Sequence, residues 1–155
     1  MNRLEGIERG QLLEQLQLIL PRAISDAPIA LAYLYGSAAQ GRTTPLSDID
    51  LAVVARDPSA LTRSFELETK LAVELARHGL AGVDVRLINH APIMLKGAAI
   101  TEGILVYSAD EHFRVEFETF TRQQYFDYLP VARRMQDDYI RAVLSRPSRS
   151  ARVAG

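Results

Sequence analysis

The chain of 155 residues contains no cysteine. This absence excludes disulfide bonds, thiolate nucleophiles and cysteine-ligated zinc, and it agrees with a reducing compartment. No apolar run is long enough to span a bilayer. The segment Met1–Gly10 is rich in charge and has no apolar region typical of a signal peptide. We therefore expect a cytoplasmic protein with no membrane partner.

The chain also has almost no net charge: its 18 basic and 19 acidic residues give a formal charge of -1. Because no overall field attracts a polyanion, we expect no direct nucleic-acid partner. The hydrophobic fraction of 48% is ordinary for a soluble globular protein, and the length favours one domain with a sizeable core.

Several catalytic signatures are missing as well. The chain has neither a P-loop nor a dinucleotide-binding fingerprint. Its three histidines, at positions 78, 90 and 112, are scattered and lack the spacing of metal ligands. Ser37 has no nearby base of the triad kind, so a serine hydrolase is disfavoured.

The most informative stretch joins two apolar runs, Ile29–Tyr35 and Ile49–Val54, which we predict to be buried strands. Gly36 ends the first run and permits the backbone of a sharp turn. Ser37 is predicted to cap a short helix over residues 38–40. Backbone amides and a hydroxyl at such a turn can bind a phosphate group.

Carboxylates occupy the start of the second run. Asp48 and Asp50 are two residues apart, so on a strand they project to one face, with alpha carbons roughly 6.5 to 7 Å apart. Asp84, in a third predicted strand over Val83–Ile88, is a candidate third carboxylate. Such oxygen ligands suit Mg²⁺, and three of them can hold two ions. Arg86 shares the face of Asp84, where it can contact phosphate or form a structural ion pair.

Helical patterns fill the rest of the chain. Phe65, Leu71 and Leu75 are expected to face the core, and Pro130 is expected to break or bend the last helix. A short strand over Ile104–Tyr107 is expected at an edge of the sheet. The predicted helices cover Gln11–Leu20, Asp57 to about Gly79, Pro92 to about Gly103, and Asp110 to Leu144 with the interruption at Pro130.

The last third differs in composition from the rest. Seven of the 11 Phe and Tyr residues lie between Phe113 and Tyr139, and six Arg lie between Val131 and Gly155. Phe113, Phe117 and Phe120 form a helical stripe typical of a core. Further aromatics exceed the needs of one small core, so a partner surface is a second interpretation. These are Tyr125, Phe126 and Tyr128.

Gly36-Ser37 followed by Asp48-Ile49-Asp50 resembles the signature of the DNA polymerase beta-type nucleotidyltransferase superfamily. Length and the C-terminal portion, from Glu102 to Tyr128, resemble the minimal nucleotidyltransferase (MNT) antitoxins that pair with HEPN RNase toxins. The resemblance implies an α/β (α+β) fold, with a mixed sheet of about four strands flanked by helices. It also implies a nucleotidyltransferase domain over residues 1–144, and we expect a flexible tail over residues 145–155.

By the same resemblance, Asp48, Asp50 and Asp84 are catalytic and bind two Mg²⁺ ions, and Asp84 also helps to deprotonate the acceptor. The reaction implied is transfer of AMP from ATP to a tyrosine of a HEPN toxin, with which the protein could form a hetero-oligomer.

The nucleotide phosphates would be held by Gly36 and Ser37. Many relatives carry Arg before the second glycine of the motif. Here Ala39 and Gln40 stand at those positions and Arg42 follows Gly41, which makes Arg42 the candidate phosphate ligand.

Two other functions remain open from the sequence. One is a small-molecule nucleotidyltransferase of the aminoglycoside type, which would need a pocket for its acceptor. The other is a non-catalytic antitoxin that neutralises its partner by binding alone.

Overall fold

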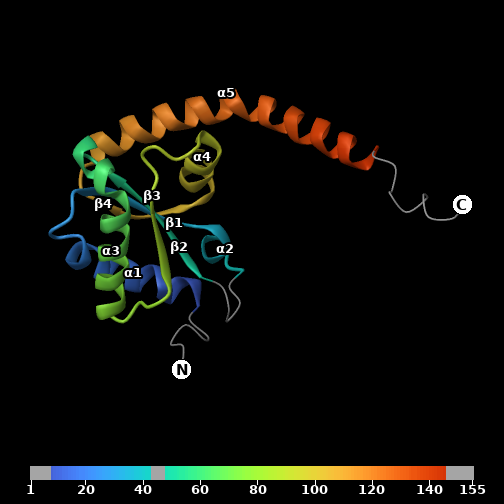
Figure 1. Cartoon of the computed structure of the whole chain (residues 1–155). Coiled ribbons are helices and arrows are strands. Elements are labelled where there is room, and N and C mark those ends of the chain that lie inside the picture. The colour runs from blue at the N-terminus through green and yellow to red at the C-terminus, as the bar shows by residue number, and fades with distance from the viewer. Residues whose placement is uncertain (1–7, 43–47, 146–155) are drawn as a thin grey trace, which may run out of the picture.

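A four-stranded mixed sheet in the order β3-β2-β1-β4 forms the centre of the computed structural model, which describes residues 8–42 and 48–145 (Figure 1). β1 pairs antiparallel with both β2 and β4, whereas β2 and β3 run parallel. The predicted mixed sheet and the edge position of the strand after Gly103 are both confirmed. The strands are β1 (Ile29–Tyr35), β2 (Ile49–Ala55), β3 (Val83–Leu87) and β4 (Ile104–Ser108).

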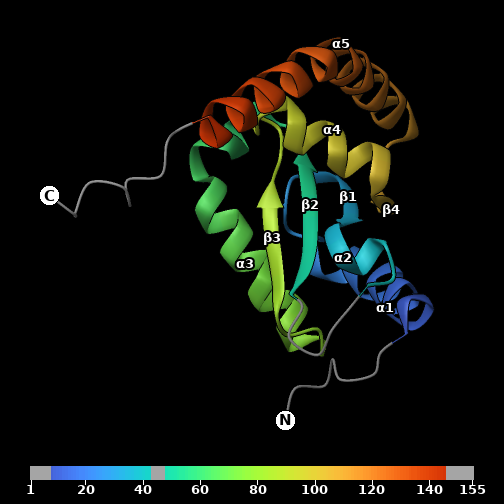
Figure 2. The ribbon, with the colours of Figure 1, turned by 90° about the vertical axis from the view of Figure 1, so that its right-hand side faces the viewer.

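Helices cover both faces of this sheet (Figures 1 and 2). α1 and α3 pack on one face, and α4 with the first half of α5 packs on the other. Across the ranges described, no helix is both long enough and apolar enough to cross a membrane. The helices are α1 (Arg9–Ala23), α2 (Gly36–Ala39), α3 (Ser64–Arg77), α4 (Ile93–Glu102) and α5 (Glu111–Leu144), and a 3-10 turn, η1 (Pro58–Arg63), precedes α3.

The two central strands are buried on both faces, which explains why their sequences are continuous apolar runs. In β2, Leu51 and Val53 belong to the core under α1 and α3, and Ala52 and Val54 belong to the core under α4 and α5. This alternation places Asp50 on the same face as Ala52, the α4 and α5 face.

The first half of α5 is fixed to the sheet by a buried polar cluster. Glu118 is 5% exposed and accepts a hydrogen bond from the Tyr33 hydroxyl, at 2.9 Å. Its other carboxylate oxygen lies 3.1 Å from a guanidinium nitrogen of Arg114 and 3.1 Å from one of Arg122. Burial, followed by the bond to Glu118, raises the pKa of Tyr33, so this hydroxyl remains a donor.

Pro130 does not break α5, which is one helix of 34 residues. Of the two outcomes predicted at this proline, a break or a bend, the break does not occur. A proline inside a helix leaves a carbonyl one turn earlier without its donor. The surrounding part of α5 is exposed, so water can satisfy that carbonyl, and the helix bows in Figure 1 without interruption.

Two smaller predictions also fail. Ser37 does not cap α2 but is its second residue, and no side chain caps that helix. Phe65 is 78% exposed, whereas Leu71 and Leu75 are buried as predicted. Phe65 lies within α3, six residues before Leu71, and at 3.6 residues per turn that spacing puts it about 120° around the helix from Leu71. Leu67, four residues before Leu71, packs against the core instead. Residues 43–47 of the predicted loop and 146–155 of the predicted tail lie outside the described residues.

Candidate functional site

Three side chains form a row across the sheet where β1 ends and β2 and β3 begin. Tyr35 pairs with Asp50 in the antiparallel register of β1 and β2, and Asp50 pairs with Asp84 in the parallel register of β2 and β3. Paired positions project to the same face, so the row lies on the face that α4 and α5 partly cover. In Figure 2 this end of β2 and β3 stands clear of both helices.

Asp50 is the central member of the row. It is half-buried between β1 and β3, whereas Asp48 is exposed and lies directly before β2 rather than within it. Burial, then the charges of Asp84 and Asp48, raise the pKa of Asp50 above its usual range. The three predicted carboxylates are therefore near enough to interact, and they concentrate negative charge at this end of the sheet.

Position 36 requires a glycine because the backbone there lies against the Asp50 carboxylate. Its φ of +72° favours glycine, and a Cβ built on it would lie 2.6 Å from the Asp50 Oδ2 atom. The turn at the end of β1 therefore touches the carboxylate of β2 directly. This places the Gly36-Ser37 segment against the acidic row, as the motif spacing predicts.

Ser37 and Arg42 lie close together through the backbone. The Arg42 amide donates a hydrogen bond of 2.9 Å to the Ser37 carbonyl, which closes the turn after α2. The Ser37 residue is half-buried, and Arg42 is exposed. Ser37 and Arg42 therefore belong to one closed turn, which directly follows Gly36.

Arg86 forms the structural ion pair considered from the sequence. Its Nε lies 3.3 Å from the Asp84 Oδ2 atom, and both side chains are about half exposed, at 57% and 47%. The Asp84 carboxylate raises the pKa of Arg86, which stays protonated. This cation offsets part of the negative charge and is accessible to an anionic ligand.

Sequence reasoning did not identify Tyr35. This side chain is half-buried in the row, and burial followed by the nearby Asp50 charge raises its pKa. Its place depends on the register between β1 and β2, which only a pairing rule for the two strands could have predicted. The one feature of the sequence that points to Tyr35 is that it stands directly before Gly36 of the motif.

The side chains are not assembled around a metal position. Within the described ranges, no three His, Cys, Asp or Glu side chains are arranged to hold an ion. The donor chemistry nevertheless fits Mg²⁺, since Asp48, Asp50 and Asp84 offer carboxylate oxygens and repel one another without a cation. Arg86 already provides Asp84 with a positive partner, at 3.3 Å.

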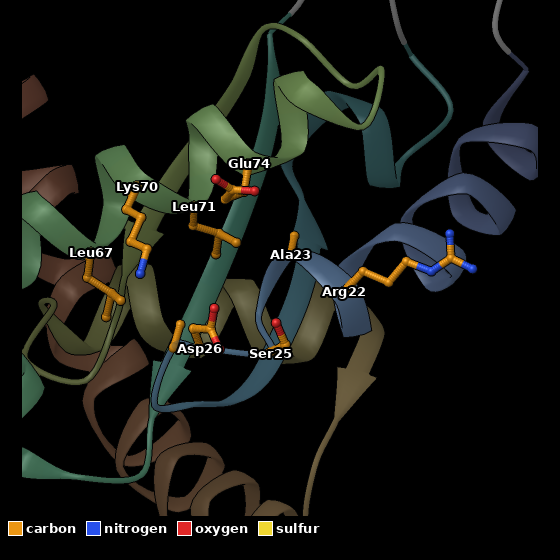
Figure 3. Close-up of a pocket in the computed structure, with 9 residues that line it drawn as sticks. Arg22, Ala23, Ser25, Asp26, Leu67, Lys70, Leu71 and Glu74 are labelled. Atoms are coloured by element: carbon orange, nitrogen blue, oxygen red, sulfur yellow. The ribbon is translucent and has the colours of Figure 1, made fainter.

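A separate pocket lies on the opposite face of the sheet, between the end of α1 and α3 (Figure 3). Its volume is about 110 Å³, and Arg22, Asp26, Lys70 and Glu74 line it. A nucleotide-sized ligand needs several hundred Å³. This pocket also has no carboxylate of the row, so we do not assign it as the site.

The family comparison agrees with the position of the row. A family model described as "Polymerase beta, Nucleotidyltransferase" matches residues 16–112, a range that contains the turn and all three carboxylates. A search of curated proteins gave no significant match.

Solved structures share the fold. The chain is similar to one in "Crystal structure of the toxin-antitoxin with AMP-PNP", with a TM-score of 0.63 and 26% identity over 80% of this chain and 98% of that chain. It is also similar to a chain in a structure of the tri-AMPylated Shewanella oneidensis HEPN toxin in complex with MNT antitoxin. The TM-score is 0.60, and the identity is 23% over 83% of this chain and 98% of that chain. A third similar chain comes from a structure of the toxin-antitoxin MntA-HepT. Its TM-score is 0.59, and the identity is 23% over 82% of this chain and 98% of that chain.

Proposed function

The chain belongs to the polymerase beta nucleotidyltransferase family, and we propose that it transfers AMP from ATP to a tyrosine of a HEPN RNase toxin, acting as its antitoxin. Membership in the family confirms the superfamily predicted from the motif. The single observation that carries the proposal is the contact between Gly36 and Asp50, within a row that continues to Asp84. It joins a phosphate-binding turn to an acidic site.

The proposed roles follow from position. Gly36 and Ser37 would bind the ATP phosphates through backbone amides and a hydroxyl, and Arg42 would contribute a guanidinium from the border of the turn. These groups would orient the α-phosphorus toward the open face of β2 and β3. Arg86 is a further cation within reach of the same face.

The carboxylates would hold the metal ions. Asp48, Asp50 and Asp84 are the ligands we assign to two Mg²⁺ ions, which when bound would neutralise the charge of the triphosphate. Asp84 is the carboxylate of the outer strand β3, and its side chain is 47% exposed. We propose that it accepts the proton of the tyrosine hydroxyl while that oxygen attacks the α-phosphorus and pyrophosphate leaves.

A protein acceptor is favoured by the openness of the site. The row lies on a sheet face next to the edge strand β3, where the side chains of Asp84 and Arg86 are about half exposed. A small molecule would need an enclosing cavity, whereas a tyrosine on a protein surface brings its own support. The similarity to a chain of a toxin–antitoxin structure points the same way.

Neutralisation by binding alone is a second candidate function. The observation that favours it is that the carboxylates are not arranged as a metal group and that Asp84 is paired with Arg86. In that case the carboxylates would have no catalytic role, and binding of this protein to the toxin would by itself protect cells.

Growth of cells that express the toxin distinguishes the two functions. We expect the parent protein to protect and the double variant Asp48→Asn, Asp50→Asn not to protect. Asp26→Asn, a matched change on an exposed loop residue away from the row, should protect fully. Full protection by the folded double variant would establish occlusion instead of catalysis.

A further inference from the structure

Arg86 is a cation at the edge of the acidic row. It stands two residues after Asp84 in β3, so both side chains project to the same face of the sheet. The parallel register pairs Arg86 with Ala52 of β2, which is the next pair on that face after Asp50 and Asp84. Ala52 has no polar side-chain group and is buried under α4 and α5. Arg86 therefore lies where the covered part of this face meets the open row.

The ion pair between Arg86 and Asp84 is a loose one. The Nε atom of Arg86 donates to the Asp84 Oδ2 atom at 3.3 Å, whereas strong bonds between these groups measure about 2.7–2.9 Å. Within the described residues, the two terminal nitrogens of Arg86 form no hydrogen bond. An ion pair this exposed, at 57% and 47%, contributes little to folding. The two side chains can therefore separate when a ligand offers either of them a stronger contact.

Metal binding would require such a separation. Under the proposed function Asp84 is a metal ligand, and a guanidinium 3.3 Å from its carboxylate repels a second cation that approaches the same oxygen atoms. As long as Arg86 stays on Asp84, its charge opposes the binding of a divalent ion there. The affinity of the carboxylates for metal is thus set partly by Arg86.

ATP would offer Arg86 another anion. A guanidinium binds a phosphate group through two parallel N–H···O bonds, which the terminal nitrogens of Arg86 can supply. Asp50 lies on β2, between the Gly36 turn that touches it from the end of β1 and Arg86 on β3. A phosphate group above Asp50 would have the turn on one side and Arg86 on the other.

We propose that Arg86 has two successive partners: it pairs with Asp84 before nucleotide binds, and it moves to the phosphates of ATP when Asp84 becomes a metal ligand. This inference rests on the proposed function and adds a phosphate-binding residue to it. Because Arg86 leaves Asp84 once for both ligands, metal and ATP each favour the binding of the other through this side chain. An arginine fixed in a structural ion pair would not couple the two ligands.

The test is a pair of binding measurements on the purified full chain without toxin. Binding of Mn²⁺ alone is measured by electron paramagnetic resonance of the free ion, and binding of ATP with Mg²⁺ by calorimetry. Arg86→Gln is expected to bind Mn²⁺ about three- to tenfold more tightly, because the competing charge is gone. The same variant should bind ATP at least about tenfold more weakly, because the phosphates lose a guanidinium contact.

Two controls separate this role from a general effect of charge. Arg77→Gln removes an arginine of α3 that pairs with Glu74 at 2.7 Å and is 69% exposed, and both affinities should stay within about twofold of the parent. Arg86→Lys keeps the charge, so Mn²⁺ affinity should stay near that of the parent, while ATP binding falls because lysine cannot form the paired bonds. All three variants should melt with the parent, because the changed side chains are exposed.

Opposite changes of the two affinities in Arg86→Gln support the proposal. A change in only one affinity, or weaker Mn²⁺ binding, overturns it. AMP transfer to the toxin by the parent, without opposite changes in Arg86→Gln, overturns the role of Arg86 and leaves the proposed function intact. Opposite changes with a parent that adds no AMP to the toxin overturn the proposed transfer and keep the role of Arg86. Absence of Mn²⁺ binding in both proteins overturns this proposal together with the metal site on which it depends.

Discussion

Replacing Gly36 by Ala tests the contact between the turn and the acidic row. The new methyl group would meet the Asp50 Oδ2 atom at 2.6 Å, which is shorter than any normal carbon–oxygen contact. The backbone also has a φ of +72°, which L-residues with a Cβ rarely adopt. Two separate effects are therefore expected, one on stability and one on the position of the carboxylate.

The stability effect follows from the backbone. An Ala in the left-handed region costs about 1–2 kcal/mol. For a domain of this size, that corresponds to a fall in Tm of about 2 to 8 °C. The effect on the site is separate, because the Asp50 carboxylate must turn away from the turn to make room. We expect AMP transfer to fall at least about a hundredfold, since a misplacement of about 1 Å has that effect.

Gly79→Ala is the matched control. Gly79 also has a positive φ, of +98°, but no atom lies within 4 Å of a Cβ built on it. It should lower Tm by a similar amount and leave AMP transfer unchanged at a temperature where both variants are folded. The assay is intact mass of the toxin after incubation with ATP. Equal transfer by the two variants would refute the role we give to the Gly36–Asp50 contact.

Three further predictions concern stability. Glu118→Ala leaves the buried Tyr33 hydroxyl without its acceptor, and we expect a loss of about 2–3 kcal/mol in urea unfolding; a change below about 0.5 kcal/mol would argue against the cluster as an anchor of α5. Gly97→Ala places a methyl group 2.2 Å from the Tyr125 ring and should cost about 1–3 kcal/mol in the same assay, whereas a neutral result would contradict the tight packing of α4 on α5. The pKa of Asp50 is raised in the folded state, so its favourable contribution is complete below its unfolded pKa and is lost as the pH rises through the folded pKa. Asp50→Asn should therefore melt higher than the parent at pH 7 in EDTA, with a difference that shrinks toward about pH 4, and a pH-independent difference would show that the shift is absent.

Much of the fold follows from local pattern in the sequence. The runs Ile29–Tyr35 and Ile49–Val54 are uninterrupted because their strands are buried on both faces, and such runs are recognisable without a structure. Leu71 and Leu75 keep the helical period inside α3. Phe65 does not, because it stands six residues before Leu71, a spacing that does not return to the same side of a helix with 3.6 residues per turn.

The candidate site is predictable in its residues but not in its arrangement. Asp48 and Asp50 could be selected from spacing, and Asp84 from its place in a predicted strand. The row that joins Tyr35, Asp50 and Asp84 depends on strand register, which is a property of the assembled sheet. The contact of Gly36 with Asp50 is likewise tertiary, although the need for glycine there was visible in the motif.

Pro130 shows that a local rule can also fail when the surroundings of a residue are not known. Local rules predict a broken or bent helix, because proline removes a backbone donor. α5 continues past it because its surroundings are exposed and the freed carbonyl can bond to water. As a result, one continuous helix both packs on the domain at Tyr125 and carries the exposed Met135 and Tyr139 beyond it.

The central claim is that the acidic row transfers AMP to a protein tyrosine. Its most direct test is the intact mass of purified HEPN toxin after incubation with this protein, ATP and Mg²⁺, followed by peptide mapping. The parent should add AMP to tyrosine, and Asp50→Asn should add none while it still binds the toxin. Equal modification by the folded Asp50→Asn variant, or no modification by a folded parent that binds both toxin and ATP, would contradict the claim.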